Sequence, residues 1–240
     1  MKIITENLVK IYSERTVVNQ VSIEVNKGEV VGLLGPNGAG KTTTFYMVVG
    51  LIRPNSGKIY IDDIDLTNMT MDMRARHGIG YLPQEASIFR KLSVEDNIKL
   101  VLELNHKLNK KQKKDKLEEL LEEFKIKKLR DTSAVSLSGG ERRRVEIARA
   151  LAASPEFILL DEPFAGIDPI AIGEIKDNIK LLSNRGLGVL ITDHNPKATL
   201  SITDRAYLVF DGSIKIQGTK EKVANNPNAK KYYLGEDFTL

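Results

Sequence analysis

The sequence predicts an α/β fold in which a block of helices is inserted into a chain that forms a mostly parallel sheet. Short apolar runs at residues 30–34, 157–160 and 188–192 are typical of strands buried on both faces. Helical patterns follow these runs, and such alternation of strand and helix favours parallel pairing. Between residues 93 and 153 the pattern is helical, which indicates an inserted helical subdomain.

The first third of the chain is expected to form mainly strands. These strands cover residues 2–12, 21–25, 30–34, 58–61 and 79–82. The last of them ends at Pro83, because proline has no N–H to donate to a neighbouring strand. One helix, at residues 42–49, follows the apolar strand 30–34.

The remaining two thirds begin with the helical block. Its helices are predicted at residues 94–105, 110–127 and 141–153, and Ser93 is a good N-cap for the first. After the strand 157–160 we expect a helix at 170–183, a strand at 188–192 and a hairpin formed by 206–210 and 213–217. The tail, residues 220–234, is predicted to form two short helices.

Composition and charge exclude several classes of function. The 240 residues include no cysteine, which rules out disulfides and thiolate chemistry. No apolar run reaches the ~18 residues of a transmembrane helix, and the N-terminus is too polar for a signal peptide. The net charge is +4, but the lysines of 107–116 lead directly into acids on an amphipathic helix, so we expect a solvated face and no nucleic-acid partner. The sequence therefore predicts a cytoplasmic protein that reaches a membrane only through a partner.

A glycine-rich loop between the strand 30–34 and the helix 42–49 is the strongest functional signal. It reads Gly35-Pro36-Asn37-Gly38-Ala39-Gly40-Lys41-Thr42-Thr43. Glycines allow backbone N–H groups to turn inward around a phosphate, and the start of a helix adds partial positive charge. Lys41 is expected to bind the β- and γ-phosphates, and the Thr42 hydroxyl to bind Mg²⁺. The sequence therefore predicts a phosphate-binding P-loop.

Two acids, Asp161 and Glu162, end the apolar strand 157–160. In an open α/β sheet, ligands bind beyond the carboxyl ends of the strands. Successive side chains of a strand point in opposite directions, so the two carboxylates can have different roles. Asp161 fits a water-mediated Mg²⁺ contact beside Thr42, and Glu162 fits the residue that orients and polarises an attacking water.

A second small, glycine-rich helix entrance is Leu137-Ser138-Gly139-Gly140-Glu141. Ser138 can cap the helix, while the free N–H groups of Gly139 and Gly140 can bind an anion. The chain therefore carries two phosphate-competent elements about a hundred residues apart.

These motifs occur in the order P-loop, Gln84, Leu137-Ser138-Gly139-Gly140-Glu141, residues 157–162 and His194. This order resembles the nucleotide-binding subunits of ABC transporters over essentially the whole chain. The resemblance implies a P-loop NTPase core with an N-terminal antiparallel β-subdomain and an inserted α-helical subdomain. Its implied boundaries are 1–88 and 154–240 for the core and 89–153 for the helical part. It also implies an ATPase that uses ATP and Mg²⁺ as a head-to-tail homodimer, with Ser138 of one copy at the γ-phosphate held by the other.

The resemblance assigns four further residues. Tyr12 occupies the place of the aromatic residue that stacks on adenine. Gln84 resembles the residue that touches Mg²⁺ or the attacking water and reports to the membrane partner. Asp168 matches a short loop that crosses to the opposite subunit, and His194 is placed to contact the γ-phosphate. The implied catalytic set is Glu162, His194, Gln84 and Lys41.

A narrower resemblance is carried by residues 80–90, 141–146, 161–168 and 233–238. These segments are similar to the ATPase subunits of the bacterial lipopolysaccharide exporter. That similarity implies docking on two membrane permease subunits, joined by a single-span subunit, at the cytoplasmic face of the inner membrane. Phe89 and Arg90 would line the groove that receives a helix of the permease.

Two other classes of function remain. A soluble ATP-driven machine acting on DNA or ribosomes is disfavoured, because this chain has one cassette and no sustained heptads. An import ATPase, for instance for branched-chain amino acids, stays open as the alternative. Residues 88–90 and the tail 235–238 favour the exporter.

Overall fold

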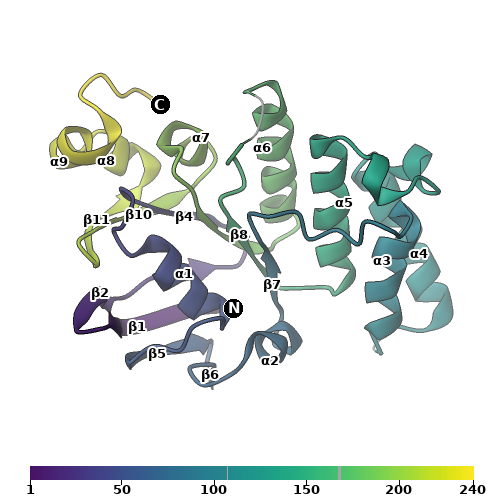
Figure 1. Ribbon diagram of the computed structural model, residues 1–240, viewed down its shortest axis with the longest axis horizontal. Coiled ribbons are helices and arrows are strands. Elements are labelled where there is room, and N and C mark those ends of the chain that lie inside the picture. The colour runs from purple at the N-terminus through teal and green to yellow at the C-terminus, as the bar shows by residue number, and fades with distance from the viewer. Residues whose placement is uncertain (107, 167–168) are drawn as a thin grey trace.

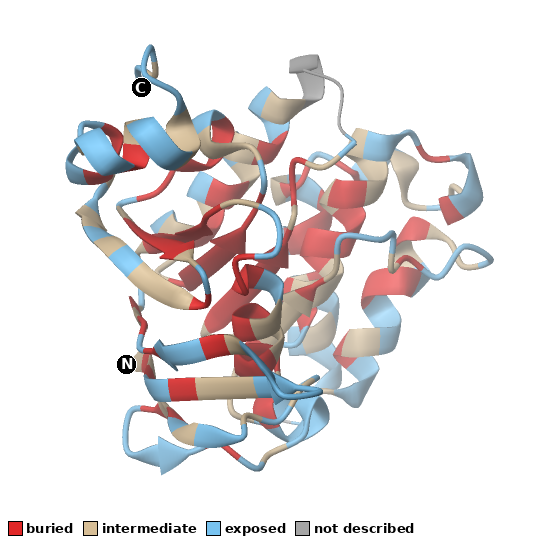
Figure 2. Cartoon of the chain, turned by 60° about the vertical axis from the view of Figure 1, so that its left-hand side comes forward, coloured by how far each residue is buried: buried red, intermediate tan, exposed pale blue. Residues whose placement is uncertain are grey.

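The computed structural model describes the chain except residues 107, 167 and 168, and it also leaves out the side chains of residues 169–171. Figure 1 shows two sheets on one side of the molecule and a group of helices, α3 to α5, at the other end. Buried residues concentrate in the central strands (Figure 2).

The larger sheet has six strands and is parallel except at one edge. Their spatial order is β11 (Ser213–Thr219), β10 (Arg205–Phe210), β4 (Val30–Leu34), β9 (Gly188–Thr192), β8 (Phe157–Asp161) and β7 (Ile79–Leu82). Only β11 runs antiparallel to its neighbour, as the predicted hairpin requires. Every residue of β4, β8 and β9 is buried, which explains their uninterrupted apolar sequences. The predicted parallel core is confirmed.

The second sheet is antiparallel and lies at the N-terminal part of the chain. It consists of β2 (Arg15–Val21), β1 (Lys2–Tyr12), β5 (Ser56–Ile61) and β6 (Ile64–Asp65), with β3 (Glu24–Asn26) paired to β1. Helix α1 (Lys41–Val49) lies between the two sheets, so Ile3, Phe45 and Leu159 share one hydrophobic core. The expected antiparallel β-subdomain is confirmed.

Three helices form the helical block: α3 (Val94–Leu104), α4 (Lys110–Glu123) and α5 (Gly139–Ala152). They pack with α6 (Pro169–Asn184) on the other face of the parallel sheet, in a second hydrophobic core. Two short 3₁₀ turns, η1 (Lys127–Leu129) and η2 (Ala134–Ser136), connect α4 to α5. Ser93 caps α3 as predicted, since its hydroxyl accepts the N–H of Asp96 at 3.0 Å.

Several local expectations were wrong. The strand predicted at 21–25 is the end of β2 followed by β3, and the polar residues of β2 hid most of that strand from a search for apolar runs. Helices α2 (Met71–Arg76) and α7 (Pro196–Leu200) were not predicted, because each is too short to show a helical period. Helix α4 ends at Glu123 rather than at residue 127. In the tail, α8 (Lys220–Ala224) and α9 (Pro227–Ala229) continue into a π-helical turn, η3 (Lys230–Leu234).

Within the part of the chain that the structure describes, no helix is both long and apolar enough to cross a membrane.

Candidate functional site

The loop after β4 depends on glycine for its shape. Gly35, Gly38 and Gly40 have φ angles of +146°, +78° and +97°. A Cβ on Gly35 would lie 2.1 Å from the carbonyl oxygen of Val209, and one on Gly40 would lie 2.5 Å from that of Val17. Only glycine fits these close approaches, which let the backbone wrap around a small anion.

Lys41 is the first residue of α1 and is only 7% exposed. Its ammonium group donates to the carbonyl oxygens of Gly35, at 2.7 Å, and Pro36, at 2.9 Å, so the cation is held at the P-loop. Burial lowers its pKa, and the nearby carboxylates of Glu162 and Asp193 act in the opposite direction. Thr42, the next residue, is exposed at the helix start. This arrangement fits a bound phosphate chain whose negatively charged oxygens lie near the Lys41 ammonium group.

Asp161 and Glu162 stand at the carboxyl end of β8, as predicted. Asp161 is 3% exposed, and its Oδ2 accepts the hydroxyl of Tyr81 at 3.3 Å. Burial raises the pKa of Asp161 above its ordinary value. Glu162 has φ +42°, an unusual conformation for a side chain other than glycine, and its N–H donates to Thr192 at 2.8 Å. The chain therefore turns sharply between the two acids.

His194 follows β9 and lies beside Glu162. Its Nδ1 is 3.3 Å from Oε2 of Glu162, and about half of its side chain is exposed. The pairing brings together two predicted catalytic residues that are 32 positions apart in sequence. The side chains of Glu162 and His194 can therefore both contact a ligand bound at the carboxyl ends of β8 and β9.

Sequence reasoning missed Asp193, the residue before His194. It is fully buried, and its oxygens accept the N–H groups of Phe164, at 2.9 Å, and Asn195, at 2.7 Å. Burial raises its pKa, while those N–H groups favour the charged form. An acid directly after the buried strand 188–192 was the available signal.

Gln84 is exposed and lines a cavity of about 200 Å³ together with Glu162 and Gly139. Tyr12 lies at the end of β1 and is 44% exposed, with the ammonium group of Lys10 5.1 Å from its ring centre. Its ring is therefore available for stacking. Asp168 lies outside the described residues.

Ser138 caps α5 in the predicted manner. Its hydroxyl and the Glu141 carboxylate form a reciprocal capping box, and these hydrogen bonds lower the pKa of Glu141. Ser138 and Gly139 are exposed, and a Cβ on Gly139 would meet nothing within 4 Å. Within the described residues no hydrogen bond joins Ser138 to the P-loop, so this helix entrance is free to face another molecule.

The residues near Thr42 and Asp161 fit Mg²⁺ only together with a phosphate. Among the described residues no group of three or more His, Asp or Glu side chains could hold a metal alone. A hydroxyl and a buried carboxylate are hard oxygen ligands, and Mg²⁺ in nucleotide sites takes few protein ligands besides phosphate oxygens and water. The donor set therefore matches Mg²⁺ bound with a triphosphate.

Residues 84–90, called here the docking segment, are fastened to the helical block. The buried Glu146 carboxylate accepts the N–H groups of Ser87 and Ile88, at 2.6 and 3.2 Å. Asn97 accepts the N–H of Phe89 at 2.9 Å, and Arg149 lies over the Phe89 ring, 4.9 Å from its centre. Phe89 is nevertheless 46% exposed. A mainly apolar cavity of about 260 Å³ lies beside Arg149, between β7 and α5.

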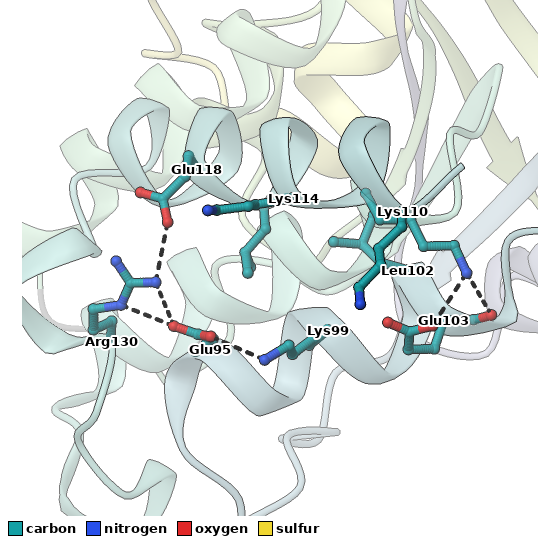
Figure 3. A pocket seen from close by; sticks show the side chains of 10 residues that line it. Glu95, Lys99, Leu102, Glu103, Lys110, Lys114, Glu118 and Arg130 are labelled. Atoms are coloured by element: carbon teal, nitrogen blue, oxygen red, sulfur yellow. Dashed lines mark hydrogen bonds and ion pairs between the residues drawn. The ribbon is translucent and has the colours of Figure 1, made fainter. Parts of the chain in front are cut away.

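Another cavity, of about 250 Å³, lies between α3 and α4 (Figure 3). Ion pairs cross this gap: Arg130 contacts Glu95 and Glu118, and Lys113 contacts Glu103. Arg130 therefore joins the connection after α4 to both helices, and Lys113 joins α4 to α3. The lysine-rich helix is therefore balanced by acids, in agreement with the predicted solvated face.

The family model of ABC transporters matches residues 18–165, more than half of the chain, and this match includes the P-loop, Ser138 and Glu162. The chain belongs to the ABC transporter family. The lipopolysaccharide export system ATP-binding protein LptB of Haemophilus influenzae is 60% identical over the full length of both chains. The protein of the same name from Escherichia coli is 58% identical over 98% of both.

Solved structures agree with this family assignment. An ATP-binding cassette of an ABC transporter in its ADP conformation has a TM-score of 0.86 and 31% identity, covering 98% of this chain and all of the other. A dimeric cassette bound to ADP and phosphate has a TM-score of 0.75 and 25% identity over 91% of this chain and 98% of the other. The predicted fold and the predicted class of enzyme, an ATPase of an ABC transporter, are confirmed.

Proposed function

We propose that this protein is the ATP-hydrolysing motor subunit of a lipopolysaccharide exporter. The observation that carries the proposal is the cluster of Lys41, Glu162 and His194 at the carboxyl ends of β4, β8 and β9. The 60% identity over the full chain to an export ATP-binding protein supports the choice of cargo. The relatives compared carry the exporter's name, so the importer of branched-chain amino acids is not favoured.

Nucleotide binding is assigned to the P-loop and Tyr12. The backbone N–H groups of residues 37–43 and the Lys41 ammonium group bind the phosphates, and the exposed Tyr12 ring stacks on adenine. Thr42, Asp161 and Gln84 would hold Mg²⁺, which when bound neutralises charge on the phosphate oxygens. The present hydrogen bonds of Lys41 to loop carbonyls are exchanged for phosphate contacts.

Hydrolysis is assigned to Glu162 and His194. The Glu162 carboxylate orients the attacking water and accepts its proton. His194 contacts the γ-phosphate, and the 3.3 Å separation of its Nδ1 from Oε2 of Glu162 supports a role for both groups at the same phosphorus. The buried Lys41 stabilises the negative charge that develops on the leaving phosphate.

The working unit is a homodimer of two head-to-tail copies. Ser138, Gly139 and Gly140 of one copy contact the phosphates in the other, which makes use of the exposed entrance to α5. We assign Asp168 to the contact between the copies. Two-fold symmetry lets the same surface complete both sites.

The docking segment is the contact with the membrane subunits. Phe89 and Arg90 meet a helix of each of two permease subunits, which a single-span subunit joins at the cytoplasmic face of the inner membrane. Exposed Phe89 is suited to an apolar contact, and its anchors on α3 and α5 pass movement to the helical block.

The test is to purify the complex with affinity-tagged wild-type protein and with Phe89→Ala. We expect the wild type to retain permeases whose cargo is lipopolysaccharide, and Phe89→Ala to lose them while keeping its own ATPase rate. Recovery of amino-acid importer subunits, or retention of the permeases by Phe89→Ala, would contradict the assignment.

A further inference from the structure

We infer that Tyr46 and Tyr81 position the carboxylate of Asp161 for Mg²⁺ through their hydroxyl groups. This inference rests on the proposed function, because it takes Asp161 as the residue that faces the metal. It assigns roles to two tyrosines outside the P-loop and the catalytic pair.

The contact geometry carries the inference. The Tyr81 hydroxyl donates to Oδ2 of Asp161 at 3.3 Å, at a carboxylate that is 3% exposed. The Tyr46 hydroxyl faces the same carboxylate and the Tyr81 hydroxyl. A buried carboxylate has few water molecules to satisfy it, so its protein donors decide where its oxygens point.

Helix geometry links Tyr46 to the expected metal ligand. Tyr46 lies four residues after Thr42 on α1, so the two side chains lie on the same face of that helix. Asp161 ends β8, and Tyr81, on the neighbouring β7, pairs with Leu159, two residues before Asp161. The Phe45 ring contacts both tyrosine rings, with centre distances of 6.3 and 6.2 Å, and restrains their orientation.

The position of Tyr81 also joins the metal ligand to the docking segment. Tyr81 lies three residues before Gln84, on the strand that leads through Pro83 into that segment. A displacement of the segment that moves β7 would change the hydrogen bond to Asp161. The affinity for the metal would then depend on whether a membrane partner is docked.

The experiment compares Tyr46→Phe, Tyr81→Phe and the double variant with wild type. Binding of Mn²⁺ in place of Mg²⁺ is measured by electron paramagnetic resonance with ATP present, on the Glu162→Gln background to prevent hydrolysis. Removing residues that hydrogen-bond to a metal-binding side chain lowers the metal affinity about 10-fold or more. We expect at least that loss of Mn²⁺ affinity in the double variant. ATP affinity in EDTA should stay within about 2-fold, which also shows that the variants fold.

Tyr60→Phe is the matched control, because it removes the same hydroxyl from β5 in the other sheet. We expect it to leave the Mn²⁺ affinity unchanged. If Asp161→Asn weakens Mn²⁺ binding and the double tyrosine variant does not, the positioning role is overturned while the proposed function stands. If Asp161→Asn itself has no effect, the metal assignment fails and the inference fails with it.

Discussion

Oδ2 of Asp193 accepts the backbone N–H of Phe164 at 2.9 Å, inside the protein, across 29 positions of sequence. Phe164 lies two residues after Glu162, and Asp193 is the neighbour of His194. The hydrogen bond therefore ties the chain after the proposed catalytic base to the chain that carries the histidine. The second oxygen of Asp193 holds the N–H of Asn195, so both sides of this link are fixed.

Asp193→Asn should reduce the rate of hydrolysis while sparing nucleotide binding. An amide has one acceptor oxygen, so either Phe164 or Asn195 would face an NH₂ group in place of an acceptor. Because misplacement by about 1 Å can cost 100-fold, we expect kcat to fall by about 10- to 100-fold, with ATP affinity within about 3-fold of wild type. Steady-state ATPase assays and fluorescent nucleotide titrations measure the two quantities. The control is Asp177→Asn, at an exposed carboxylate on α6, which should keep the wild-type kcat. An unchanged kcat in Asp193→Asn would show that hydrolysis does not need the hydrogen bonds of Asp193 to Phe164 and Asn195.

Glu162→Gln should bind ATP and hydrolyse it at least about 100-fold more slowly, because the amide cannot accept the proton of the attacking water. With Mg²⁺ and ATP present, size-exclusion chromatography should show a dimer that accumulates. Glu221→Gln, a matching change at an exposed residue of α8, should behave as wild type. A normal rate in Glu162→Gln would remove Glu162 from the role of base.

Asp161→Asn should stabilise the protein without nucleotide or metal, and more so at neutral than at acidic pH. Burial raises the pKa of Asp161 in the folded state above its ordinary value of 3.8. As pH rises from 3.8 through the folded-state value, the unfolded chain loses its proton first, so the wild type loses stability relative to the asparagine variant. Above that window the difference is constant. Urea unfolding of both proteins at pH 4, 5 and 7 in EDTA tests this, and a difference that shrinks with rising pH would contradict it.

Arg74→Met should destabilise the fold by about 3 kcal/mol or more, since hydrogen bonds to charged groups contribute about 1.5–3 kcal/mol each. Arg74 is buried, and its guanidinium donates to the carbonyls of Met47 and Val48 at the end of α1, at 2.6 and 2.7 Å. Its removal leaves those carbonyls buried without a donor. Arg74→Lys keeps the charge but has fewer hydrogen-bond donors. Its urea midpoint should therefore lie between those of the wild type and Arg74→Met. A loss below about 1 kcal/mol for Arg74→Met would show that water replaces the guanidinium.

Much of this architecture could be predicted from the sequence because its signals are local. The strands at 30–34 and 188–192 are continuous apolar runs, and the P-loop is a contiguous motif. What could not be predicted depends on tertiary packing. Asp193, Glu146 and Arg74 are charged residues whose buried partners lie far away in sequence, so composition alone suggests that they are exposed. The strand β2 was missed for a related reason, since its polar residues are stabilised by pairing with β1 rather than by burial.

Helix α5 begins at the proposed contact with the opposite nucleotide and carries Glu146 and Arg149 further along. An α-helix of 14 residues is a rod about 20 Å long, stiff enough to convey a push from one end to the other. If the two copies close on nucleotide as proposed, α5 would carry that movement to the docking segment, the proposed contact with the membrane subunits. Nucleotide binding and movement at the membrane contact would then be coupled, because both act on the same rigid helix.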